Sequence, residues 1–100
     1  MNYAQEVDSR RRLQILQLMI EDGGQANDGA LLTAMRAIGE RQALDQGAVR
    51  RLLRELAERG CVESEMVRDT VMVARVTERG RMAAAGDVSI GGIDSPFQGL

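Results

Sequence analysis

The sequence predicts a mainly helical α+β fold, and two observations indicate this class. Apolar residues recur at helical spacing in three segments, residues 3–21, 28–38 and 49–56, and a glycine follows shortly after each of them. Two segments that favour strands come next, Cys61–Val67 and Thr70–Thr77, separated only by Arg68-Asp69, which predicts a hairpin. Three helices followed by a β-hairpin are typical of a winged helix-turn-helix, in which the hairpin is the wing.

The first helix is expected over Tyr3–Glu21, which contains no Gly or Pro and is followed by Asp22-Gly23-Gly24. Its apolar stripe is wide, so we expect burial of much of the helix surface. The stripe consists of Leu13, Leu16, Met19 and Ile20, extended by Ile15 and Leu18.

The second and third helices each begin with a residue that can accept hydrogen bonds from free backbone amides. Asn27 caps Asp28–Ile38, whose core positions are Leu31, Met35 and Ile38, and Gly39 ends that helix. Asp45 caps the third helix, and Gly60 ends it. Within the third helix the buried stripe is Val49, Leu52, Leu53 and Leu56, and Leu44 packs on Val49 as a hydrophobic staple.

After the hairpin, Thr77 caps a short fourth helix, Glu78–Ala85, and Gly86 ends it. Residues 1–86 therefore form the winged helix-turn-helix domain, and residues 87–100 form a C-terminal tail that is either loose or packed on a partner. In the second strand we expect the face with Val76 to be buried. The predicted core comprises Leu13, Leu16, Ile20, Leu31, Met35, Val49, Leu52, Leu53, Leu56 and Val76.

Composition restricts the classes of function. The chain has 100 residues, one cysteine and no histidine, so we expect one small domain without a disulfide, metal site or cofactor. It also lacks a recognisable nucleophile and base pair, which argues against an enzyme. No run is long enough for a membrane span, and the start does not resemble a signal peptide, so we expect a cytoplasmic protein. The net charge of −2 means that nucleic-acid binding requires a local basic patch.

The outward face of the third helix is the candidate for such a patch. Arg50, Arg51 and Arg54 are expected there, with Gln46 at the N-terminal end, and these side chains suit phosphate, guanine and adenine contacts. The alternative is a solvated, salt-bridged surface, because Glu55 and Glu58 lie on the same helix.

The hairpin offers a second set of contacts. Arg68 at its tip and Arg75 on its second strand are placed to hold a flanking phosphate or the minor groove, although Glu63, Glu65 and Asp69 surround them. The Arg10-Arg11-Arg12 run can contact the DNA backbone or solvate the first helix, and its shortness favours solvation.

Several short motifs, in their order and spacing, resemble a known family. They are Asn2-Tyr3-Ala4, Arg11-Arg12-Leu13, Ile15-Leu16, Ala26-Asn27, Ala37-Ile38-Gly39, Asp45-Gln46, Leu56-Ala57-Glu58-Arg59-Gly60 and Val76-Thr77-Glu78-Arg79-Gly80. Over residues 2–86 the chain resembles the small ArsR-like winged-helix proteins of Mu-like transposable bacteriophages. The resemblance implies a winged-helix fold and a DNA-binding or phage-regulatory role. It also implies gene neighbours concerned with DNA packaging and head assembly.

Two differences from that family are visible. The turn around residues 42–48 is slightly longer, and the tail lacks a basic ending. The expected function is binding of double-stranded DNA by a homodimer that regulates transcription. The competing hypothesis is a module for contacts with phage packaging or assembly proteins.

Overall fold

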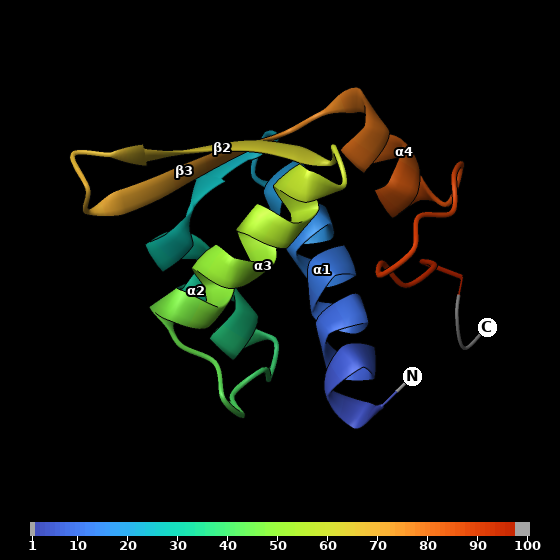
Figure 1. Cartoon of the computed structure of the whole chain (residues 1–100), viewed down its shortest axis with the longest axis horizontal. Coiled ribbons are helices and arrows are strands. Elements are labelled where there is room, and N and C mark those ends of the chain that lie inside the picture. Colours follow the sequence, from blue (N-terminus) through green and yellow to red (C-terminus); the bar gives the residue numbers. More distant parts are fainter. Residues whose placement is uncertain (1, 98–100) are drawn as a thin grey trace.

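A computed structural model describes residues 2–97, which form four helices and a three-stranded antiparallel sheet (Figure 1). The predicted α+β class with mainly helical content is confirmed. In chain order the elements are α1 (Tyr3–Glu21), β1 (Gln25–Asn27), α2 (Asp28–Ala37), α3 (Gln46–Glu58), β2 (Val62–Val67), β3 (Val71–Val76) and α4 (Glu78–Ala85).

The helix starts follow the predicted capping chemistry. The side chains of Asn27, Asp45 and Thr77 each accept a hydrogen bond from the backbone amide three residues later, as expected. At α1, Asn2 and Gln5 form a capping box: the Gln5 amide donates to Asn2 Oδ1 at 2.9 Å, and the Asn2 amide donates to Gln5 Oε1 at 3.0 Å. Local sequence therefore sets where these four helices begin.

The strands are arranged in the order β1-β3-β2, so β3 is central. In the hairpin, Val62 pairs with Val76 and Val67 with Val71. Strand β1 was not predicted; its Ala26 pairs with Ala74 of β3. Its sequence, Gln-Ala-Asn, contains no β-branched or aromatic residue, so only pairing with β3 makes it a strand.

The hairpin turn contains two residues with positive φ, Arg68 at 53° and Asp69 at 56°. The Thr70 amide donates to the Val67 carbonyl at 3.1 Å and closes the turn. Positive φ at both central residues matches the right-handed twist of the flanking strands, as in a type I′ turn. The turn therefore projects the Arg68 side chain from the end of the hairpin.

The core lies between the helices and the inner face of the hairpin. Nine of the ten predicted core residues are buried, and the tenth, Ile20, is half-buried. The predicted burial of the Val76 face is confirmed, since Met72 and Ala74 are buried with it. The prediction for Ile38 is wrong: it is 52% exposed, because α2 ends at Ala37 and Ile38 is its C-cap.

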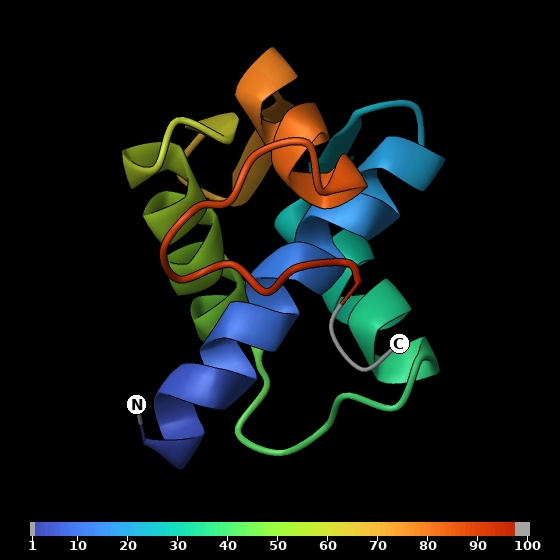
Figure 2. The same ribbon diagram turned by 90° about the vertical axis from the view of Figure 1, so that its right-hand side faces the viewer.

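Residues 87–97 pack on the rest of the described chain, so this part of the tail is not loose. Figure 2 shows this segment, in red, crossing the outer side of α1. Ile90 is buried, and the Asp94 amide donates to the Ser9 carbonyl at 3.2 Å. Arg12 and Arg59 donate to the Gly92 and Gly91 carbonyls at 2.8 and 2.9 Å. The rest of the predicted tail, residues 98–100, lies outside the described part.

No helix within residues 2–97 is long and apolar enough to cross a membrane.

Candidate nucleic-acid interface

The buried stripe of α3 orients its arginines outward. Val49, Leu52, Leu53 and Leu56 are fully buried against the other elements, as predicted. Arg51 and Arg54 are exposed on the other side of the helix, and Arg50 is half-buried at the edge of that side. The three candidate arginines nevertheless differ in what their guanidinium groups contact.

Arg50 is held by a buried carboxylate. Its Nε atom is 2.5 Å from Oδ2 of Asp28, the first residue of α2, and the Asp28 side chain is fully buried. Gln46 Nε2 donates to the same oxygen at 3.1 Å, and the Gly29 amide donates to Oδ1 at 2.9 Å. Burial raises the pKa of Asp28, but the hydrogen bonds from Arg50 and Gln46 outweigh it and leave that pKa below its ordinary value. Asp28 is therefore ionised and paired at neutral pH.

Arg50 also connects α3 to the hairpin. Its Nη2 atom donates to the Thr70 carbonyl in the hairpin turn at 2.7 Å. One guanidinium thus joins the start of α2, the first half of α3 and the tip of the β2–β3 hairpin. Two of the six candidate DNA contacts, Gln46 and Arg50, already have intramolecular partners around Asp28.

Arg51 is paired on the helix surface. Its Nη1 atom lies 3.0 Å from Asp8 Oδ2 and 3.1 Å from Glu55 Oε1. Its Nη2 atom donates to Asp8 Oδ1 at 3.2 Å, so Asp8 accepts from both ends of the guanidinium. The hydrogen bond with Asp8 raises the pKa of Arg51. For this residue the structure shows the salt-bridged arrangement that was the alternative to DNA contact.

The remaining three candidates, Arg54, Arg68 and Arg75, are exposed, and within residues 2–97 their side chains make no hydrogen bond or ion pair. Arg54 lies on α3 and Arg68 in the hairpin turn. Arg75 is on the outer face of β3, opposite Glu63, whereas Met72, Ala74 and Val76 face the helices. The fold therefore separates Arg75 from the outward face of α3.

Within the Arg10-Arg11-Arg12 run, Arg10 is exposed as expected, but Arg11 and Arg12 are not solvated. The Arg11 and Arg12 side chains are only 6% and 10% exposed, and both are paired: Arg11 with Glu40 at 2.9 Å and Arg12 with Glu55 at 2.8 Å. Helical spacing could have predicted the burial of Arg11 and Arg12, because they lie one turn before the fully buried Ile15 and Leu16. The buried stripe of α1 thus continues through two charged residues.

Glu40 anchors the first part of this network. Arg10, Arg11 and Gln14 all donate to its carboxylate, at 2.8, 2.9 and 3.3 Å. Burial raises the pKa of Glu40, but these hydrogen bonds outweigh burial and lower that pKa from 4.5 to about 2. The loop before α3 is thus tied to α1 by an ionised carboxylate.

A scan of protein-family models, a search of curated proteins and a search of solved structures each found no match to this chain.

Proposed function

We propose that this protein is a winged helix-turn-helix protein that binds double-stranded DNA and regulates transcription, without catalysis. One observation carries the proposal: the hairpin turn lies beside the first half of α3, joined to it by the Arg50–Thr70 hydrogen bond. The hairpin also extends past the helices at the end where α3 begins (Figure 1). A helix with an exposed outward face beside a projecting hairpin suits one helix in a groove and one hairpin on the adjacent backbone.

The main proposed DNA contacts are candidate arginines that are exposed and have no carboxylate partner in the described part of the chain. Arg54 on α3 and Arg68 in the hairpin turn are exposed and unpaired within residues 2–97, so they reach a phosphate without first breaking an ion pair. Arg51 contributes by exchanging Asp8 for a phosphate. Gln46 and Arg50 act mainly by fixing α3 and the hairpin in their relative positions. Arg75 contributes least, because it lies on the other face of the sheet.

A second candidate is a winged-helix module that contacts phage packaging or assembly proteins. Two observations favour it. Arg51 already has carboxylate partners, which reduces the positive field of α3. The end of β2 exposes Met66 and Val67, which are 38% and 41% accessible, and such apolar side chains suit a protein surface better than a phosphate backbone.

A salt titration separates the two candidates. Binding to phage and host DNA fragments is measured by fluorescence anisotropy for the wild type and for Arg54→Gln and Arg68→Gln. Arg81→Gln is the matched control, because it removes the same charge from an exposed position on α4. If Arg54 and Arg68 contact phosphates, each change weakens binding and flattens the slope of log K against log salt by about one unit.

The control variant should bind like the wild type. If the wild type shows no salt-sensitive affinity for any duplex, or if the two variants bind as tightly as Arg81→Gln, DNA binding through this face is refuted and the protein-contact role takes its place.

We also propose that the protein acts as a homodimer. Sedimentation at micromolar concentration should then give twice the chain mass of 10.9 kDa.

A further inference from the structure

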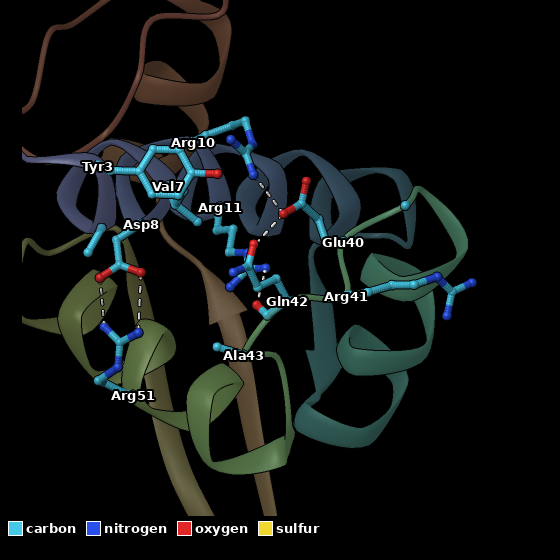
Figure 3. Close-up of a pocket in the computed structure, with 12 residues that line it drawn as sticks. Tyr3, Val7, Asp8, Arg10, Arg11, Glu40, Arg41, Gln42, Ala43 and Arg51 are labelled. Atoms are coloured by element: carbon cyan, nitrogen blue, oxygen red, sulfur yellow. Dashed lines mark hydrogen bonds and ion pairs between the residues drawn. The ribbon is translucent and has the colours of Figure 1, made fainter.

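A groove separate from the outward face of Arg54 lies between the first half of α1 and the loop that joins α2 to α3 (Figure 3). Its volume is about 440 Å³, within the range of small-molecule sites. One side carries Tyr3 and Val7 of α1, and the other carries Glu40, Gln42 and Ala43 of the loop. None of these residues was singled out as a candidate site.

The groove contains more positive charge than its carboxylates neutralise. Arg10 and Arg11 share the single carboxylate of Glu40, at 2.8 and 2.9 Å, so this trio carries a net charge of +1, and the charge of Asp94 also acts on Arg10. The other lining carboxylate, Asp8, is held by both ends of the Arg51 guanidinium. Arg41 adds a further charge at the rim, where Figure 3 shows its side chain directed outward.

Arg11 retains an unused hydrogen-bond donor at this place. Its side chain is only 6% exposed; Nε donates to Glu40 and Nη2 donates to the Gln42 carbonyl at 2.8 Å. Within residues 2–97, Nη1 has no partner. Nη1 is not among the buried polar atoms that lack a partner, so it reaches solvent and can donate to an acceptor that enters the groove.

The apolar part of the groove is also unpartnered. Tyr3 is 71% exposed, the most exposed large hydrophobic side chain in the described part of the protein. Ala43, on the opposite wall, has a φ of 51°, a conformation that is strained for alanine. Strained backbone of this kind is concentrated at binding sites. Tyr3 and Arg11 thus line the same groove (Figure 3).

We propose that this groove binds a small organic anion in which a carboxylate or phosphate is attached to a planar apolar group. The anionic group accepts from Arg11 Nη1 and neutralises the excess charge of Arg10 and Arg11, while the planar group packs against Tyr3 and Val7. Arg51 and its partner Asp8 line the groove as well as the outward face of α3, whereas Arg54 and Arg68 do not line it, so variants of Arg54 and Arg68 test DNA binding separately from this site.

The test uses benzoate as the probe, followed by NMR on the ¹⁵N-labelled full chain. Tyr3 is the single tyrosine of the sequence, so its ring signals report on the groove without ambiguity. Benzoate should produce saturable shifts of the Tyr3 ring and of the Arg11 Nε–H signal at millimolar concentrations. Benzamide, which lacks the charge, and acetate, which lacks the ring, should each bind at least about tenfold more weakly.

Two exposed positions allow variants that preserve the core. Tyr3→Ala should weaken benzoate binding to the level of acetate, and Arg10→Gln should weaken it about two- to fivefold, the range for an exposed charge pair. Arg54→Gln, outside the groove, should bind benzoate like the wild type. The proposal is overturned if benzoate gives no saturable shift, if benzamide binds equally well, or if Tyr3→Ala binds like the wild type.

Discussion

The arginines of α1 and those of α3 show how differently one residue type is used within a single small domain. In α1, Arg11 and Arg12 are nearly buried and paired with Glu40 and Glu55. In α3, Arg54 is exposed and has no partner within residues 2–97, while Arg50 is tied to a fully buried carboxylate. Sequence alone assigned the opposite roles, with α1 solvated and α3 free to bind DNA.

The difference arises from carboxylates that are distant in sequence. Glu40 is 29 residues from Arg11, Glu55 is 43 from Arg12, and Asp28 is 22 from Arg50. Among the ion pairs of the described residues 2–97, only Arg51–Glu55 has the i,i+4 spacing that a single helix reveals. An arginine is therefore available for a ligand only where the fold brings no carboxylate to it, and this property belongs to the tertiary structure.

The largest effect is expected from Arg50→Ala compared with Arg54→Ala. Removal of Arg50 leaves Asp28 buried without its counter-charge, so the free energy of unfolding should fall by about 3 kcal/mol. Arg54→Ala removes an exposed side chain and should change stability by less than about 0.5 kcal/mol. Urea unfolding of the two variants measures the difference. Equal stabilities would mean that Arg50 is as free as Arg54, and would return it to the set of direct DNA contacts.

A smaller effect is expected from Glu40→Gln, which removes the carboxylate shared by Arg10 and Arg11. At neutral pH we expect a loss of about 1–3 kcal/mol, because the nearly buried Arg11 loses a charged partner. The pKa of Glu40 is about 2 in the folded protein, below its ordinary value of 4.5. Its stabilising contribution is therefore complete above about pH 4.5 and is lost as the pH falls toward 2.

Urea unfolding at a series of pH values checks this dependence. The wild type should lose stability more steeply than Glu40→Gln between pH 4.5 and 2, and the two curves should converge at the acid end. Parallel curves over this range would show that the Glu40 carboxylate does not stabilise the fold through its charge.

The helices and the hairpin could be predicted because their determinants are local. Caps such as Asn27 and Asp45, the stripe through Val49 and Leu56, and the glycine after each helix act over one or two turns. Strand β1 could not be predicted, since three residues without strand-forming side chains depend on β3 for their conformation. The packing of residues 87–97 likewise depends on α1 and on donors such as Arg59.

The candidate interface was predicted only as a set of residues on one face. The outward orientation of Arg54 follows from helical periodicity, and the position of Arg68 follows from the turn. The engagement of Gln46 and Arg50 by Asp28 was not visible, because nothing in the local sequence indicates that the first residue of α2 is buried. The burial of Arg11 and Arg12 could have been predicted from helix periodicity if charged residues had also been considered as members of the buried stripe of α1.

Asp8→Asn should have a smaller effect on stability than Arg50→Ala or Glu40→Gln, and it gives the sharpest test of the comparison. Asp8 holds the partly exposed Arg51, and such surface pairs contribute up to about 1 kcal/mol, so the fold should remain intact. If the outward face of α3 binds DNA, loss of Asp8 frees Arg51 for a phosphate, which should tighten binding a few-fold and steepen the salt slope by up to about one unit. Asp87→Asn is the control, because it removes one negative charge from an exposed position after α4. Identical DNA affinities for the two variants would show that Arg51 remains a structural residue, like Arg11 and Arg12, even when its carboxylate partner is removed.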